Sequence, residues 1–250
     1  MKKWRLLSGI IALTSFIGGC SCSKVDDSTY ISAVETYKNT DAIGFTRVEI
    51  IKVEGQTTYV RKKVEANYIF DSNKDVERMS YSLLVTENNS GGGSDVSLSS
   101  TYHYSKDSET LYNHYKIGKS QEERYKYTNT TYSDNFNANK CNDSNCNLMI
   151  LTNLAPIYSF DEISEFRIEE KDGGAIAHYK GICPGYENCA SNSQMLDYTM
   201  RINKDGNIES LSYEIVNGST TNTITYGFSG YGSNEVVVIL PAQLDSYIEK

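Results

Sequence analysis

The sequence predicts a mainly β (α+β) protein: a single curved antiparallel sheet, or half-barrel, of about ten or eleven strands with an N-terminal helix and one mid-chain helix. Three observations predict this fold. The 250 residues include 20 tyrosines but one tryptophan and three prolines, and tyrosine and β-branched residues fit a pleated, half-buried surface. Apolar and polar side chains alternate along most segments, which is the period of a sheet with one wet face. Turn residues separate these segments, and no break indicates a second core.

The first 19 residues predict a secretory signal peptide. A basic start is followed by an uncharged run over residues 6–19, which is shorter than the roughly 20 apolar residues of a membrane-spanning helix. Small residues close the run, as they do before a signal cleavage site. Residues 1–19 are therefore expected to be removed, leaving residues 20–27 as a tether and residues 28–250 as the folded domain.

The end of this run, Ile17-Gly18-Gly19-Cys20, resembles the lipobox of bacterial lipoproteins. The resemblance implies that Cys20 is linked to diacylglycerol, which brings palmitate, and becomes the mature N-terminus on the outer face of the bacterial cell membrane. Cys22 fits less well, because Gly19 would then fill the aliphatic position. The alternative is a plain secretory signal with Cys20 in a disulfide.

The charge and the remaining cysteines fit an exported protein. The formal net charge is −8, and an acidic body argues against nucleic acid as a partner, which requires clustered Lys and Arg. The spacings Cys141-x₄-Cys146 and Cys183-x₅-Cys189 suit two small disulfide loops in an oxidising compartment. Zinc is the competing interpretation, although the usual CxxC pairs are absent.

The first half of the chain predicts a helix and then a meander. The helix begins near Ser28, with Asp27 or Ser28 as its N-cap. The alternation then predicts strands over residues 45–54, 58–70, 79–86, 96–104, 111–117 and 122–132. Lys62 and Ile69 are the exceptions to the alternation within residues 58–70. In residues 96–104, Val96 and Leu98 are predicted to share one face.

The second half predicts a polar loop, one helix and further hairpins. Leu148, Leu151 and Leu154 fit one helix face that ends before Pro156. Strands follow around Phe166–Glu169, Ala175–Ile182, Leu196–Ile202, Leu211–Ile215, Ile224–Phe228 and Glu235–Leu240.

The order of these elements resembles the LolA-like lipoprotein superfamily, including its LppX/LprG-type lipid-binding members. The resemblance rests on the lipobox, the meander, the mid-chain helix, the hairpin MRINKDGNIESLSYEI and the closing segment NEVVVILP. It implies an antiparallel half-barrel around helices, with an apolar concave cavity for lipid or acyl chains. The resemblance assigns no ligand-contacting residue.

No set of residues at informative spacing predicts catalysis or a cofactor. Gly118-Lys119-Ser120 lacks the first glycine of a phosphate loop, and Tyr231 replaces a glycine of the nucleophile elbow. The stretch Asp71 to Glu77 resembles a calcium loop without its glycine, so a polar hairpin turn is expected. The three histidines lie on different strands.

We therefore expect a non-enzymatic, membrane-anchored extracytoplasmic lipoprotein that binds or carries a lipid or other amphiphile in an apolar cavity. The alternative is a surface interaction or sensor module of the same fold without a small-molecule ligand, which would meet a protein or cell-wall partner through its outer face or through loops 88–95, 133–147 and 183–194. We expect the cavity wall to consist of inward-facing side chains of the sheet and of the covering helix: Val60, Val64, Tyr68, Val96, Leu98, Tyr102, Leu151, Leu154, Met200, Ile202 and Ile224.

Overall fold

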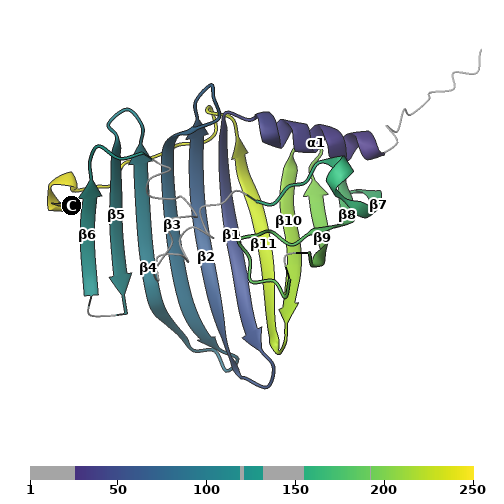
Figure 1. The fold of residues 1–250 in the computed structure, drawn as a ribbon, viewed down its shortest axis with the longest axis horizontal. Coiled ribbons are helices and arrows are strands. Elements are labelled where there is room, and N and C mark those ends of the chain that lie inside the picture. The colour runs from purple at the N-terminus through teal and green to yellow at the C-terminus, as the bar shows by residue number, and fades with distance from the viewer. Residues whose placement is uncertain (1–25, 119–120, 132–154, 192) are drawn as a thin grey trace, which may run out of the picture.

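The computed structural model describes residues 26–118, 121–131, 155–191 and 193–250. One helix and two 3₁₀ turns accompany a sheet that includes every strand of this part of the chain (Figure 1). The first half contributes α1 (Asp27–Asn39), β1 (Ala42–Val53), β2 (Thr58–Phe70), β3 (Val76–Asn89), β4 (Ser94–Ser105), β5 (Thr110–Ile117) and β6 (Gln121–Tyr127). The second half contributes η2 (Phe160–Glu162), β7 (Ser164–Lys171), β8 (Gly174–Ile182), β9 (Met195–Ile202), β10 (Ile208–Asn217), β11 (Thr220–Tyr231), η3 (Leu244–Ser246) and β12 (Ile248–Glu249).

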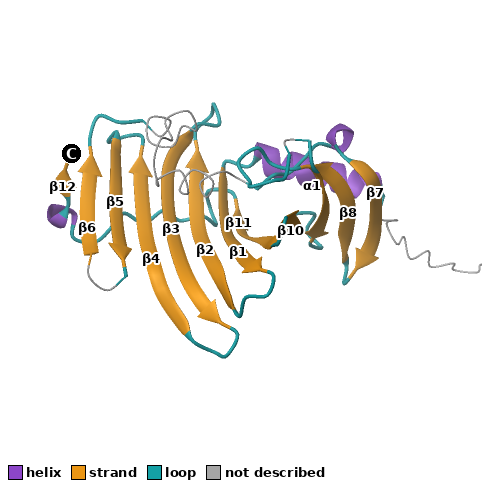
Figure 2. Cartoon of the chain, turned by 60° about the horizontal axis from the view of Figure 1, so that its bottom comes forward, coloured by secondary structure: helices purple, strands orange, loops and turns teal. Residues whose placement is uncertain are grey.

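The strands form one 12-stranded sheet in the order β12-β6-β5-β4-β3-β2-β1-β11-β10-β9-β8-β7. Neighbouring strands are antiparallel, except that the short β12 pairs in parallel with β6. β1 is the junction, because it pairs with β2 on one side and with β11, from the end of the chain, on the other. The sheet curls most at its β7–β10 end, beneath α1 (Figure 2). The predicted mainly β class and single curved sheet are confirmed, with a slightly larger strand count.

Helix α1 covers one face of the sheet at the β8–β11 end (Figure 1). Its N-cap is Asp26, whose carboxylate accepts from the backbone nitrogen of Ser28 at 3.0 Å. The predicted N-cap was Asp27 or Ser28, so the helix is capped at least one residue earlier than predicted. Two aspartates precede the apolar periodicity, and the first of them, Asp26, is the cap. Tyr30, Val34 and Tyr37 lie on the buried side of the helix, and the rings of the two tyrosines pack onto the sheet.

The predicted hairpins of the meander are confirmed. β1 and β2 turn at Gly55-Gln56, and Thr58 to Phe70 pairs along its length with β1 and β3. In the second half, Asp172 and Gly173 both have positive φ, at 52° and 80°, as a two-residue hairpin turn between twisted strands requires. The strand predicted over residues 122–132 is too long, because β6 ends at Tyr127.

The predicted closing strand Glu235–Leu240 is wrong. These residues make no ladder, although their β-branched composition favours one. The physical reason is that both edges of β11 are already paired, with β1 and β10, so the chain that leaves it finds no free edge. Residues 233–247, the C-terminal strap, instead cross the sheet on the side away from α1 and lead to β12 at the β6 edge (Figure 1).

Three groups of predictions fall outside the described residues. They are the signal peptide and tether up to residue 25, the mid-chain helix with Leu151 and Leu154, and the loop 133–147 of the interaction hypothesis with the pair Cys141 and Cys146. These remain predictions. Within the described ranges, no helix is both long and apolar enough to cross a membrane.

Candidate functional site

The concave face of the sheet, the face that α1 covers, has two different halves. We call β7–β11 with α1 the closed half and β2–β6 the open half, and β1 lies between them. The register places inward side chains opposite one another in rows that run across all these strands. A row therefore passes from the closed half to the open half without interruption, and its side chains can be compared directly.

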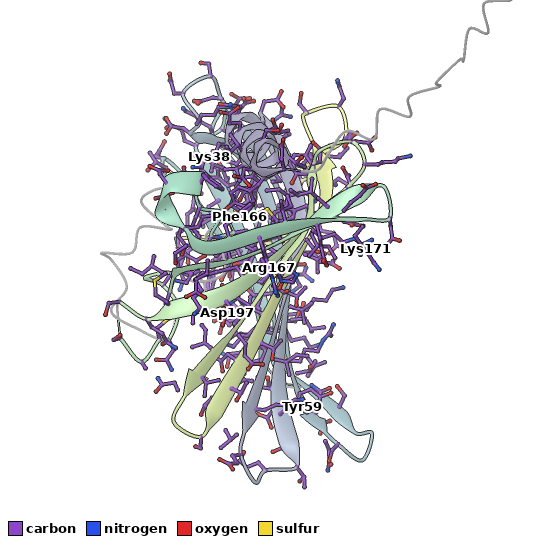
Figure 3. All side chains as sticks on the ribbon, turned by 90° about the vertical axis from the view of Figure 1, so that its right-hand side faces the viewer. Lys38, Tyr59, Phe166, Arg167, Lys171 and Asp197 are labelled. Atoms are coloured by element: carbon purple, nitrogen blue, oxygen red, sulfur yellow. A yellow bond between two sulfur atoms is a disulfide. The ribbon has the colours of Figure 1, made fainter. Side chains whose placement is uncertain are left out.

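Aromatic rings fill the closed half. Tyr30 of α1 meets Phe166 of β7 and Tyr179 of β8 edge to face, with ring centroids 5.2 Å and 5.5 Å apart, and Phe166 points toward α1 in Figure 3. Tyr179 stacks on Tyr198 at 5.3 Å, and Tyr198 reaches Tyr213 at 4.9 Å. Such ring pairs add about 0.5–1.5 kcal/mol each beyond the area that they bury. The closed half is therefore a packed core.

A loop closed by a disulfide lies over the middle of the closed half. Cys183 and Cys189 are bonded, with Cα atoms 6.5 Å apart, which confirms the prediction for this pair. We call residues 183–189 the plug loop, because its Tyr186 and Glu187 turn into the concave face. This loop belongs to the 183–194 segment that the interaction hypothesis assigned to an outer partner, and these two side chains point away from such a partner.

The plug loop contacts a buried arginine of the sheet through Glu187. Arg47 of β1 has no solvent exposure, and its Nη2 donates to Glu187 Oε1 at 2.8 Å while its Nη1 donates to Glu49 Oε2 at 2.9 Å. Its Nε donates to the Tyr226 hydroxyl at 3.2 Å, and the Tyr213 hydroxyl donates to the same oxygen of Glu187 at 2.8 Å. This cluster places an arginine and two glutamates among the buried aromatic and aliphatic side chains.

The groups around Arg47 keep its guanidinium protonated. Burial alone lowers the pKa of Arg47, but the oxygen of Tyr226 and the carboxylates of Glu187 and Glu49 outweigh it and raise that pKa above the ordinary value. Burial also raises the pKa of Tyr213, so its hydroxyl stays protonated and remains a donor. One acceptor is left over, because Asn222 Oδ1 beside Glu49 is buried and has no hydrogen-bond partner among the described residues.

Lys62 connects this cluster to the open half. On β2, Lys62 lies opposite Glu49 of β1 on one side and opposite Val85 of β3 on the other. Its Nζ lies 3.5 Å from Glu49 Oε2. Its side chain is 21% exposed, whereas that of Arg47 is fully buried. Lys62 breaks the alternation of β2 for a structural reason. Its ammonium group lies on the core side of the sheet because it contacts the carboxylate of Glu49 there.

The open half continues the same row with aliphatic side chains. Val85, Leu98 and Ile117 are directly opposite one another on β3, β4 and β5. Val85 and Leu98 pack against the core but are only partly buried, and Ile117 is 46% exposed. The concave face therefore carries an apolar strip, the Val85–Leu98–Ile117 row, that no described element seals.

The outer edge of the open half carries Glu123, with the cation of Lys250 nearby. The hydroxyls of Tyr115 and Tyr125 donate to Glu123 on β6. These hydrogen bonds, that of Tyr115 first, and a third from Gln121 lower the pKa of Glu123 to about 2. The apolar row meets β6 at Gln121, one row away from Glu123. A ligand that lies along this row therefore has the cations Lys62 and Arg47 at its β1 end.

The predicted wall residues divide between the two halves. Val64, Tyr68 and Tyr102 are buried in the open half with Val60 and Leu98 partly exposed, while Met200, Ile202 and Ile224 are buried in the closed half. The prediction that Val96 shares a face with Leu98 is wrong, since Val96 is 50% exposed. Val85 pairs with Leu98 but Thr86 pairs with Val96, so Ser97 is an extra residue, and this bulge turns Val96 to the outer face.

Sequence reasoning missed Arg47, Glu49 and Glu187. A signal for the first two was present, because the inward positions of β1 read Ile43, Phe45, Arg47 and Glu49, a charge pair at the period of the core. Nothing in the sequence marked Glu187, because it reaches Arg47 across 140 positions of the chain. Only the fold brings the plug loop over β1.

Two hollows on the outer face are lined by both polar and apolar side chains. One of about 710 Å³ sits at the β1–β2 and β10–β11 turns, with Glu54, Tyr59 and Glu214 among its lining residues. Another of about 350 Å³ lies over β7–β9, lined by Arg167 and Asp197 among others, both marked in Figure 3. None of the predicted wall residues lines either hollow, so neither is the apolar cavity that the sequence predicted.

The described residues contain no group of three or more His, Cys, Asp or Glu side chains that could hold a metal. His114 contacts Glu122 at 3.0 Å and His178 contacts Thr199 at 3.1 Å, on separate strands. Asp71 accepts from the backbone nitrogens of Asn73 and Asp75. The predicted polar hairpin turn at Asp71 is therefore confirmed.

The sequence matches no protein-family profile, and no curated protein is similar to it. Among solved structures, the chain is similar to LprF from Mycobacterium bovis at 11% identity and TM-score 0.45, covering 86% of this chain and 96% of that one. It is similar to the Mycobacterium tuberculosis lipoprotein LppX at 11% identity and TM-score 0.39, covering 86% and 100%. A DUF1329 family protein from Desulfovibrio piger follows at 12% identity and TM-score 0.33, covering 86% and 94%. The chain resembles these proteins in fold alone.

Proposed function

We propose that this chain is a lipoprotein, anchored to the outer face of the bacterial cell membrane through Cys20, whose open half binds the apolar part of a lipid or other amphiphile. The Val85–Leu98–Ile117 row supports this proposal most directly. It is an apolar strip on the core side of the sheet that stays partly exposed among the described residues. Amphiphile sites are concave, mostly apolar and largely pre-formed, and the exposed strip would supply the apolar wall of such a site.

The energetics favour an apolar occupant. Each methylene group that leaves water on the strip contributes about 0.8 kcal/mol, and the sheet offers its side chains without a large rearrangement. The row crosses four strands from Lys62 to Ile117, which at the usual strand spacing is about 14 Å. An acyl segment of that length can lie along it.

The anchor would keep the open half close to its lipid source. Two acyl chains on Cys20 suffice for stable attachment. The tether of residues 20–27 spans no more than about 25 Å when fully extended, so α1 would begin within that distance of the bilayer. Metabolic labelling with palmitate tests this part. Incorporation is expected in the wild-type chain, and labelling that survives Cys20→Ala would contradict the anchor.

Native mass spectrometry of detergent-free protein tests the ligand. We expect a co-purifying amphiphile, which Leu98→Asp should remove by placing a charge in the middle of the apolar row. Val216→Asp is the matched control, because Val216 is 51% exposed on the outer face of β10 and its change should leave the ligand bound. Ligand-free wild-type protein, with no uptake of added fatty acid, would contradict the proposal.

One observation favours the alternative of an interaction module. The C-terminal strap exposes Val237 (64%), Ile239 (70%) and Leu240 (51%) on the outer face. Single exposed apolar residues need no explanation, but adjacent ones often meet a partner. Site-specific crosslinking from Ile239 on intact cells tests this. A discrete protein adduct would support the module, while crosslinks to lipid alone would not.

A further inference from the structure

We propose that Arg47 is an anion-binding site for the head group of the ligand, and that the plug loop occupies this site with Glu187 until a carboxylate or phosphate displaces it. The inference rests on the proposed function and deepens it, since it assigns the ligand class: an anionic amphiphile. In the structure, the Glu187 carboxylate receives Arg47 Nη2 and the Tyr213 hydroxyl, each at 2.8 Å. These are the contacts that a ligand carboxylate or phosphate oxygen would make.

The charges of the cluster require an exchange rather than a simple opening. With the loop in place, the cations Arg47 and Lys62 face the anions Glu49 and Glu187. Lifting the loop takes Glu187 away and leaves the cations Arg47 and Lys62 in contact with the single carboxylate of Glu49, and a cation that loses its partner in a largely apolar wall is unfavourable. An incoming anion removes that penalty. The loop is therefore expected to open when an anionic ligand replaces Glu187.

The plug loop is built to move as one piece. The disulfide between Cys183 and Cys189 closes it, and its backbone hydrogen bonds in the described part of the chain are local: Cys183 to Gln194, Glu187 to Pro184 and Cys189 to Glu187. Its contacts with the sheet below come from side chains. Displacing it therefore breaks no strand pairing.

Lys62 provides the route between the apolar row and Arg47. It lies on the same face, partly exposed, next to Val85 of the row and in contact with Glu49 beside Arg47. An amphiphile whose tail rests on the row would place its head group first at Lys62 and then at Arg47.

The hydroxyl groups complete an anion site. Tyr213 and Tyr226 surround the guanidinium, and burial raises the pKa of both, so they remain neutral donors throughout the physiological range. Hydrogen bonds to a charged group are stronger than those between neutral groups. The site is therefore preorganised for a carboxylate or phosphate oxygen and offers little to an uncharged ester.

Fluorescence titration with cis-parinaric acid and with its methyl ester tests this inference on the full chain. The acid is expected to bind more tightly than the ester. Glu187→Gln, which removes the charge of the internal competitor, should tighten binding of the acid by about 10-fold or more and leave the ester unchanged. Glu165→Gln is the control, because that carboxylate is 67% exposed and pairs with Lys180 on the outer face.

Tyr213→Phe gives a second test that does not depend on removing a charge. It should weaken binding of the acid about 3- to 10-fold, the size of one lost hydrogen bond, and spare the ester. Equal binding of acid and ester, with neither variant changing either, would overturn the anion site while leaving the proposed function in place. If inorganic phosphate stabilises Glu187→Gln against heat and neither amphiphile binds, the anion site stands and the lipid function fails.

Discussion

The closed and open halves share one sheet, one alternation and the same rows of inward side chains, yet they differ in their covering. Rings from Tyr30 to Tyr213 fill the closed half beneath α1, and the plug loop completes its cover. In the open half, the same rows reach Leu98 and Ile117, which remain partly exposed. Alternation thus specifies which side chains face inward, whereas elements distant in sequence decide whether that face is core or binding surface.

The Arg47 cluster lies at the boundary, and breaking it should have the largest effect. Arg47→Met leaves the carboxylate of Glu187 buried without its cation and that of Glu49 with Lys62 alone, so we expect a loss of about 3–5 kcal/mol in the free energy of unfolding. Equilibrium denaturation with urea measures it. Lys62→Met is the matched control, expected to cost less than about 1 kcal/mol because its side chain is partly exposed. Equal losses of unfolding free energy for both variants would contradict the idea that the change from a buried to a partly exposed side chain occurs between Arg47 and Lys62.

Matched deletions in the two halves should separate stability from binding. Met200→Ala removes a fully buried side chain of the closed half, and we expect it to cost about 2–5 kcal/mol with little change in amphiphile affinity. Leu98→Ala in the open half should cost about 1 kcal/mol, because Leu98 is already partly exposed, but should weaken binding. Urea denaturation and fluorescence titration of both variants give the comparison. The opposite pattern would contradict the assignment of the halves.

Removing the disulfide should loosen the cover of the closed half. The double variant Cys183→Ser with Cys189→Ser frees a loop of residues 183–189, and closing so short a loop is worth about 2 kcal/mol of unfolded-state entropy. Thermal unfolding should show this loss. If the plug loop competes with ligand, the same variant should bind cis-parinaric acid more tightly than the wild type. A variant with unchanged affinity would indicate that the loop is only structural.

Local rules predicted most of the sheet and little of the site. Strands such as Thr58–Phe70 were readable because one of their faces is wet, and turns such as Asp172-Gly173 because their backbone demands particular residues. Val96 and the segment Glu235–Leu240 were misassigned, because a bulge and the lack of a free edge depend on neighbouring strands. Glu187 could not be predicted, since its partner Arg47 is distant in sequence and meets it only through the fold.

The smallest predicted effect concerns the outer face of the open half, where the C-terminal strap crosses β4. His103 is largely buried beneath it, and this burial lowers its pKa below 6.5, although a hydrogen bond with the backbone of Ile239 opposes the shift. The unfolded chain therefore takes up a proton near pH 6.5 that the folded protein resists, so the free energy of unfolding should fall as pH drops from 7 toward 5.

His103→Gln should flatten that slope, because it removes the titrating group and keeps a polar side chain under the strap. Urea denaturation of both proteins across this pH range measures the difference. Hydrogen exchange adds the location: amides of the strap and β4 should lose protection in acid before those of α1 and β8. Loss of protection first in the closed half would mean that the strap does not depend on His103. In that case the strap on the outer face would not distinguish the two halves, and they would differ only in what covers their concave face.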